Sequence, residues 1–263
     1  MEIRDKLNTL EGYQEIIKLN EKFILEISED IQKLDKSEKN GEQLYNRPNW
    51  EAIQYNLEDI FKYQYDNILA KYSAGVSVLE FKEELFPVLS TMETSWKKSN
   101  GYVQMVWMLS IAIMLNIEDE KFIKLVKMVE KDNPNDFLVD FLIRHRIPSW
   151  QGKSDNLMFK RPYLATQEIV TLAQYDKIKG LERLKKYLLK EWYRGHSDAG
   201  WHDAHKSNWN IHTGYWCFES GALVKILGLD DTSLKGLLYY PYDMVHWNDE
   251  IVIPKQRSWT ILD

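Results

Sequence analysis

Residues 7–34 read LNTLEGYQEIIKLNEKFILEISEDIQKL, and their apolar positions recur at steps of three and four residues. These positions are Leu7, Leu10, Ile16, Ile17, Leu19, Phe23, Ile24, Ile27, Ile31 and Leu34. A helix turns once every 3.6 residues, so such steps place the apolar side chains on one face. The stretch predicts one long amphipathic helix, which ends in the charged residues around Lys36–Glu42.

The same periodicity continues to about residue 130. Asn49 is placed to cap a second long helix with the inner stripe Ile53, Leu57, Ile60, Phe61, Ile68 and Leu69. Ser77 and Glu80 have capping-box spacing and predict the start of a third helix, which we expect Pro87 to bend. Residues 102–115 predict a helix buried almost all round, and residues 120–130 predict a one-sided helix.

The run DNPND at residues 132–136 combines a proline with several turn formers and predicts a domain boundary. We expect an acidic N-terminal helical domain over residues 1–131 and a second helical domain over residues 132–263. In the latter, helices are expected at 137–146, 162–173 and 177–193, and the polar segment 195–213 as an ordered connection. The predicted fold is all-α, with two packed helical subdomains, roughly ten helices and no significant sheet.

Charge and composition narrow the function. The formal net charge is −6, and residues 1–100 carry 13 Lys and Arg against 19 Asp and Glu. An acidic half argues against nucleic acid as a partner, because phosphate binding needs a basic surface, and it suits a basic protein partner. Cys217 is the only cysteine, no secretion signal is recognisable, and the apolar stretch Val103–Ile117 is too short to span a bilayer. We therefore expect a cytoplasmic protein without a membrane partner or a cofactor.

The stretch from Gly214 to His246 reads GYWCFESGALVKILGLDDTSLKGLLYYPYDMVH. It predicts a helix that opens at Tyr215 and stops at Gly228, because glycine commonly follows the last turn of a helix. Asp230 or Asp231 would cap a short following turn. Pro241 is expected to keep the tail out of a helix.

This stretch resembles the C-terminal domain of the PoNi family, the immunity proteins of bacterial polymorphic nuclease toxins. The resemblance implies a protein without catalytic activity that binds and neutralises a cognate DNase toxin in interbacterial competition. It leaves the identity of the toxin and the choice between monomer and homo-oligomer open. The positions that carry the family's structural signature are Trp201, His205, Lys206, Gly214, Tyr215, Trp216, Phe218, Glu219, Tyr239, Tyr240, Pro241, Tyr242, Asp243 and His246.

Candidate contacts with a basic toxin are carboxylates in the acidic half, chosen for their charge and position. They are Glu42, Glu51, Glu58, Asp59, Asp66, Glu83 and Glu84. Tyr239–Asp243 is either a ring-rich contact surface or a clamp for the tail, and we favour the clamp. The basic residues Lys177, Lys179, Arg183, Lys185, Lys186, Lys190 and Arg194 follow one predicted helix and are typical of a solvated face.

The main alternative is a metal-dependent hydrolase built on residues 196–212, HSDAGWHDAHKSNWNIH. His196, His202, Asp203, His205 and His212 are the ligand types that zinc accepts, but no His-Glu-x-x-His spacing occurs. We favour a polar network that holds this segment, with no metal.

Glu219 lies among apolar residues, and two roles are again possible for it. It is either a general acid or a structural partner of His205, Lys206 or a tyrosine hydroxyl, and we favour pairing. Cys217 is expected to be a core thiol rather than a nucleophile.

Overall fold

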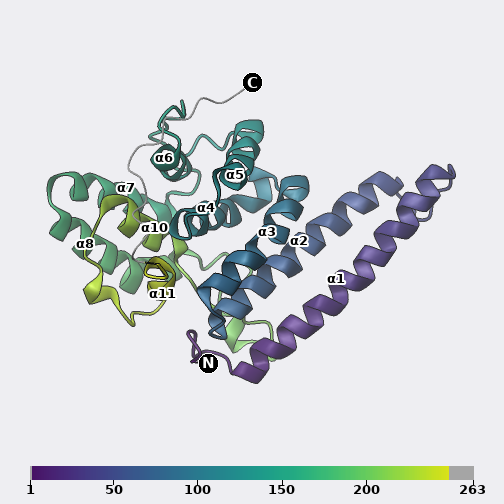
Figure 1. Ribbon diagram of the computed structural model, residues 1–263, viewed down its shortest axis with the longest axis horizontal. Helices are drawn as coiled ribbons and strands as arrows, with labels where there is room; N and C mark the ends of the chain where they lie inside the picture. The colour runs from purple at the N-terminus through teal and green to yellow at the C-terminus, as the bar shows by residue number, and fades with distance from the viewer. Residues whose placement is uncertain (1, 249–263) are drawn as a thin grey trace. The chain divides into compact units, whose positions relative to one another are not determined.

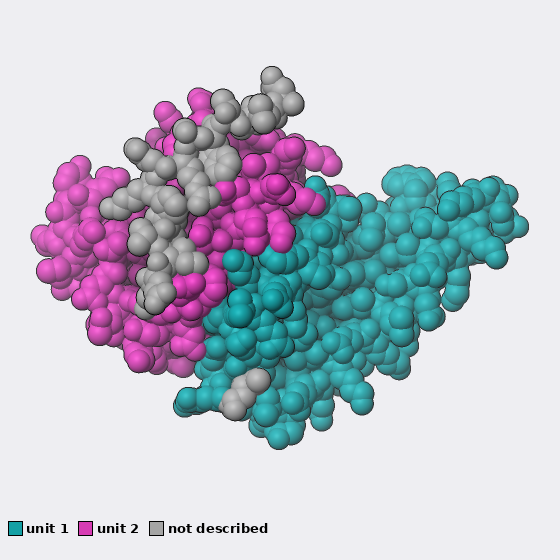
Figure 2. Space-filling model, in the orientation of Figure 1, with its two compact units in different colours: residues 1–96, 203–214 teal, residues 97–202, 215–263 magenta. Residues whose placement is uncertain are grey.

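The computed structural model describes residues 2–248, which contain helices and turns but no β-strand. The prediction of an all-α fold is confirmed. Contacts divide the chain into two compact units, distinguished by colour in Figure 2. Unit 1 comprises residues 1–96 and 203–214, and unit 2 comprises residues 97–202 and 215–263. Within the described range, no helix combines the length and the apolar character needed to cross a bilayer.

Unit 1 is built on two long helices, α1 (Leu10–Lys39) and α2 (Asn49–Ser73), which pack side by side (Figure 1). The Thr9 side chain caps α1 by accepting a hydrogen bond from the Gly12 N–H at 3.0 Å. The predicted long helix is therefore confirmed, but Leu7 precedes it. Leu7 and Leu19 are 45% and 49% exposed, because only part of the apolar stripe faces α2.

The contact between α1 and α2 has an apolar cluster near one end and a polar pair further along. Tyr13 and Ile16 of α1 are buried with Ala70 and Ala74. The buried Asn20 donates to the Oδ1 of Asn67 at 2.9 Å, so each buried amide has a partner. These contacts fix the register of the two helices.

Asn49 differs from its predicted role as a cap, because it is the first residue of α2 and Pro48 occupies the cap position. Its buried side chain instead donates to the carbonyl of Glu42 at 2.6 Å and accepts from the Leu44 N–H at 3.1 Å. Asn49 therefore holds the connection between α1 and α2 in place.

The third helix, α3 (Val78–Ser95), begins as the capping-box spacing predicts, since Ser77 Oγ accepts from the Glu80 N–H at 3.2 Å. Pro87 lies inside this helix. The helix packs against α2, and the Lys71 Nζ lies 2.6 Å from the Glu84 carboxylate across that contact.

Residues 203–214 belong to unit 1, far along the chain from the rest of it. They include a 3-10 turn at Ala204–Lys206. The Asn210 side chain donates to the Gly12 carbonyl at 2.8 Å, and Ser73 Oγ donates to the Thr213 carbonyl at 2.7 Å. The expectation of an ordered connection is confirmed.

Unit 2 surrounds α4 (Lys98–Met114), which is buried on nearly every side over residues 105–115, as predicted. It packs against α5 (Asp119–Asp132), α6 (Phe137–Arg146), α10 (Phe218–Leu227) and α11 (Tyr242–Val245). Around them lie α7 (Lys160–Tyr175), α8 (Lys177–Lys186), a π-helical segment (Tyr187–Glu191), α9 (Trp192–Gly195) and a 3-10 turn (Thr232–Leu234).

Two predicted helices of unit 2 are wrong in detail. The helix expected over residues 177–193 is interrupted by the π-helical segment, in which the Trp192 N–H bonds to the Tyr187 carbonyl five residues back. Tyr215 and Trp216 precede α10 instead of opening it, and Pro241 is followed by the short helix α11. The stop at Gly228 is confirmed, with φ +60°. Asp230 supports the next turn, since its carboxylate accepts from the Thr232 N–H at 3.1 Å.

The domain boundary expected near residues 131–136 stays a prediction. In the contact-based division, α5 and α6 both belong to unit 2.

Candidate partner-binding surface

The end of the α1–α2 hairpin at which the two helices are connected combines charge with exposed rings. We use the name hairpin end for residues 40–59, which comprise the connection and the first turns of α2. In Figure 1 the two helices run together to this end. The connection contains Gly41, with φ +70°, a left-handed conformation that glycine adopts without strain. The Asn49 side chain holds this loop through two hydrogen bonds, one donated to the Glu42 carbonyl and one accepted from the Leu44 N–H.

Three of the predicted carboxylates lie on one stripe of α2 at the hairpin end. Glu58 and Asp59 follow Glu51 by seven and eight residues, which is about two turns of the helix, because each residue turns a helix by about 100°. The exposed Tyr55 lies on the same stripe, four residues from Glu51 and four from Asp59. Glu42 is exposed on the adjoining connection. Lys62 follows on this stripe, so the stripe is acidic mainly over its first part.

Aromatic side chains at the hairpin end are unusually exposed for their size. Trp50 is 65% exposed, Tyr55 48% and Tyr45 47%. Tyr45 donates to Asp30 at 2.8 Å, and the Arg47 guanidinium lies 4.9 Å from the centre of the Tyr55 ring. Exposed Trp and Tyr next to charged residues are typical of protein-binding surfaces. The sequence analysis missed these rings, although their density between two amphipathic helices was visible.

The other three predicted carboxylates lie away from the hairpin end. Glu84 pairs with Lys71, twenty residues along α2 from Glu51, which corresponds to about 30 Å of helix. Glu83 is exposed on the same helix as Glu84. Asp66 is half-buried, and this burial raises its pKa from 3.8 to about 6 although Lys62 opposes the shift. The seven residues therefore do not form one site.

Aromatic signature residues of unit 2 take part in one cluster of packed rings. Trp192 lies near the centre, with ring centroids 5.5 Å from Trp201, 6.4 Å from Trp107 and 4.9 Å from Tyr239. Phe218 packs edge-on against Trp107 at 5.7 Å. Tyr215, Trp216 and Phe218 are all buried. The cluster is a packed core, because its large rings face one another.

Glu219 is fully buried beneath this cluster and is paired. One carboxylate oxygen accepts from the Tyr187 hydroxyl and from the Trp192 indole N–H, both at 2.9 Å. The expected tyrosine partner is confirmed, whereas His205 and Lys206 lie in unit 1, where Lys206 Nζ is 2.9 Å from Asp203. Burial raises the pKa of Glu219 despite these hydrogen bonds, and it also raises that of the neighbouring Cys217 thiol. A buried Cys217 matches the expected core thiol.

The tail is held by buried hydrogen bonds, as a clamp requires. Tyr240, 3% exposed, donates its hydroxyl to Asp231, and His246 Nε2 lies 2.9 Å from the same carboxylate. The Cys217 N–H donates to the carbonyl of Tyr239 at 2.8 Å. Tyr242 packs on His246 with ring centroids 4.3 Å apart. This geometry favours the clamp over a ring-rich contact surface.

The histidines of the alternative hydrolase site are held by rings, backbone groups and a carboxylate, and His205 and His212 pack on each other with ring centroids 5.9 Å apart. Both ring nitrogens of His196 are engaged, by the Trp192 carbonyl at 2.8 Å and the Tyr163 hydroxyl at 3.0 Å. Burial lowers the pKa of His196 to about 4. His202 stacks on Tyr193, and His212 Nε2 lies 3.1 Å from Asp5. Over residues 2–248, no three His, Cys, Asp or Glu side chains are grouped to hold a metal ion.

Comparison with known proteins identifies related sequences over nearly the whole chain. A family model described as PoNe immunity protein (PoNi), N-terminal, matches residues 4–127. A second, described as PoNe immunity proteins (PoNi), C-terminal, matches residues 134–244. A search of curated proteins finds no match.

One solved structure with a similar fold is the crystal structure of protein PA2201 from Pseudomonas aeruginosa. The TM-score is 0.60 at 15% sequence identity, and the match covers 94% of this chain and 98% of that chain. At this identity the likeness concerns the fold alone.

Proposed function

Because this chain belongs to the family of PoNe immunity proteins (PoNi), we propose that it binds and neutralises a cognate DNase toxin without catalysing a reaction. It would act in the cytoplasm and protect its bearer in competition between bacteria. The family supplies the immunity role and implies a toxin as the partner. That the toxin is a DNase is what the family resemblance implies, whereas the compartment and the binding surface are inferred from this chain.

The observation that carries the proposal is the separation of charge between the units. Unit 1 has 12 Lys and Arg against 20 Asp and Glu, a net of −8, whereas unit 2 has 22 against 20, a net of +2. A nuclease must bind phosphate and therefore presents basic side chains. An acidic surface attracts that face and competes with DNA for it.

The hairpin end is the part of unit 1 that best suits such a contact. Its exposed Trp50 and Tyr55 supply anchors, and Glu51, Glu58 and Asp59 supply charge around them. Interfaces commonly owe most of their binding energy to a few aromatic or charged anchors within about 1,200–2,000 Å² of buried surface. On this proposal, the toxin's DNA-binding face closes over the hairpin end and DNA is excluded.

The first experiment measures DNA degradation by the nuclease-like product of the neighbouring gene while this purified protein is added in increasing amounts. We expect activity to reach zero near one equivalent of this protein, with a stable complex on size-exclusion chromatography. Full nuclease activity at several equivalents, with no complex formed, would remove that nuclease as the partner.

Two variants of the hairpin end, compared with a control variant of unit 2, test whether the hairpin end binds the toxin. The triple change Glu51→Gln, Glu58→Gln and Asp59→Asn is expected to weaken binding about tenfold or more, because it removes charge opposite the basic face. Trp50→Ala is expected to weaken it by a further tenfold or more, as loss of an aromatic anchor does. The control removes three exposed charges from unit 2 by Glu120→Gln, Glu130→Gln and Glu182→Gln. If both hairpin-end variants bound the toxin as tightly as the control and the wild type, the hairpin end would not be the binding surface. The proposed immunity role would be unaffected.

A further inference from the structure

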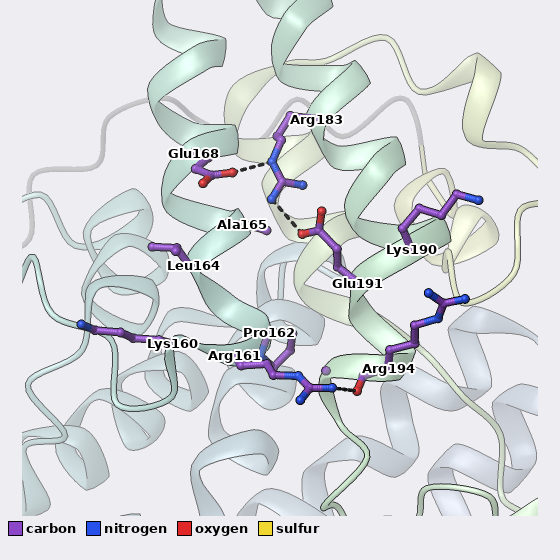
Figure 3. A pocket seen from close by; sticks show the side chains of 11 residues that line it. Lys160, Arg161, Pro162, Leu164, Ala165, Glu168, Arg183, Lys190, Glu191 and Arg194 are labelled. Atoms are coloured by element: carbon purple, nitrogen blue, oxygen red, sulfur yellow. Dashed lines mark hydrogen bonds and ion pairs between the residues drawn. The ribbon is translucent and has the colours of Figure 1, made fainter.

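A cavity of about 330 Å³ lies within unit 2, between the start of α7 and the segment that runs from α8 to α9 (Figure 3). It is lined by Lys160, Arg161, Pro162, Leu164, Ala165, Glu168, Arg183, Lys190, Glu191, Arg194 and Gly195. Ligand sites in proteins usually begin at about 300 Å³, so this space fits a small molecule.

The lining carries five cationic side chains against two carboxylates. Both carboxylates are already bound to one cation: Arg183 Nε donates to Glu168 at 2.5 Å and its Nη2 donates to Glu191 at 2.8 Å. Figure 3 shows the Arg183 side chain between these two acids. The three groups form a fixed wall that ties α7 to the helical segment opposite.

The remaining cations are not neutralised. Lys160, Lys190 and Arg194 have no ion pair among residues 2–248, and all three are exposed. Arg161 donates to the backbone carbonyl of Arg194 at 2.6 Å, so its guanidinium is oriented without losing its charge. The cavity therefore has an excess of three positive charges.

The opposite wall is apolar and closely packed. Pro162 and Ala165 are buried, whereas Leu164, also on α7, is 47% exposed. Gly195 approaches Pro162 so closely that a Cβ at position 195 would lie 2.2 Å from Pro162 Cβ. Glycine is therefore required where the two segments meet, which gives this end of the cavity a fixed shape.

We propose that this cavity binds a compact polyanion of the diphosphate class. Its excess charge matches a multiply charged group better than a single carboxylate, and Arg and Lys together bind phosphate oxygens by charge-assisted hydrogen bonds. The site lies in unit 2, and the proposal does not depend on binding of a toxin by unit 1. Three of the seven basic residues expected on a solvated face, Arg183, Lys190 and Arg194, also line this cavity, and Lys190 and Arg194 are exposed as expected.

The test is isothermal titration of the full chain with inorganic pyrophosphate, phosphate, sulfate and malonate at constant ionic strength. We expect one pyrophosphate per chain, bound at least tenfold more tightly than phosphate, sulfate or malonate. The double variant Lys190→Gln/Arg194→Gln should lower the pyrophosphate affinity about a hundredfold, since two charge-assisted contacts are lost at about tenfold each. Lys185→Gln is the single-charge control, because Lys185 lies on the same helical segment outside the cavity.

With two variants and four anions compared, each outcome either supports or contradicts the proposed diphosphate site. Preference for malonate over pyrophosphate would overturn the diphosphate assignment in favour of a carboxylate ligand. Binding that is absent, or equally weak in wild type and double variant, would overturn the site altogether. Both variants should keep the wild-type circular dichroism spectrum and melting temperature without ligand, because none of the three side chains is buried. Their ability to inhibit the nuclease, measured separately, reports on the proposed function alone.

Discussion

At the scale of single residues, the most consequential group is a buried carboxylate. Glu219 is completely buried, and one of its oxygens serves two buried donors, the Tyr187 hydroxyl and the Trp192 indole N–H. An acceptor shared by two donors from another part of the chain holds α10 against the π-helical segment. Removing the acceptor leaves both donors unsatisfied, which costs more than the hydrogen bonds themselves contribute.

Glu219→Ala is expected to lower the free energy of unfolding by about 2–5 kcal/mol, because two buried donors lose their partner and a cavity remains. Glu219→Gln keeps one acceptor oxygen and should cost less. Denaturant unfolding at several pH values separates these effects. Burial raises the folded pKa of Glu219 above 4.5, so its contribution is greatest below that pH and is lost as the pH rises through the folded value. The deficit of the Gln variant should therefore shrink from pH 5 to pH 8, and a constant deficit would contradict this account.

Asp66 offers a second test. Its pKa rises from 3.8 to about 6 because its carboxylate is desolvated. A raised pKa means that the ionised form destabilises the fold, and this cost grows between pH 4 and pH 6 and persists above. Asp66→Asn should raise the free energy of unfolding by about 1–3 kcal/mol at pH 8 and have little effect near pH 4. Stability that is unchanged at both pH values would show that Asp66 is solvated.

At the scale of elements, the ends of these helices are set by capping residues close in sequence, whereas the interior of a helix can depend on distant contacts. Ser77 starts α3 and Gly228 stops α10 by hydrogen bonds and dihedral angles within a few residues, and both were predictable. The π-helical segment Tyr187–Glu191 was not, because residues 177–193 keep a regular helical pattern of apolar residues. One extra residue in the turn directs Tyr187 and Trp192 to the same carboxylate, a requirement set by α10.

Gly228→Ala tests the stop of α10. The residue has φ +60°, where a Cβ costs about 1–2 kcal/mol. Among residues 2–248, an added Cβ meets one atom within 4 Å, the Lys177 Nζ at 3.2 Å. We expect the free energy of unfolding to fall by about 1–2 kcal/mol from backbone strain alone. Gly200→Ala is the control, since a Cβ there meets nothing within 4 Å and no left-handed φ is involved. Equal stability of the two variants would contradict the role of the left-handed conformation.

At the scale of the whole molecule, the uneven charge predicts how binding to the toxin depends on salt. A net of −8 on unit 1 accelerates encounter with a basic partner over distances that salt screens, about 10 Å at 0.1 M. Raising sodium chloride from about 0.05 to about 0.5 M should slow association about tenfold and change dissociation much less. Surface plasmon resonance measures both rates. An association rate independent of salt would show that charge does not guide this complex.

The sequence alone determined the helical class, most helix ends, the acidic half and the family. Periodicity, caps and charge act through neighbours within about four residues or through simple totals, so they can be read without coordinates. Only the tertiary structure decided that residues 203–214 join unit 1, and that Glu219 meets Tyr187 and Trp192. It also decided which basic residues line a cavity. These features depend on contacts between segments far apart in the chain, which packing selects and no local pattern records.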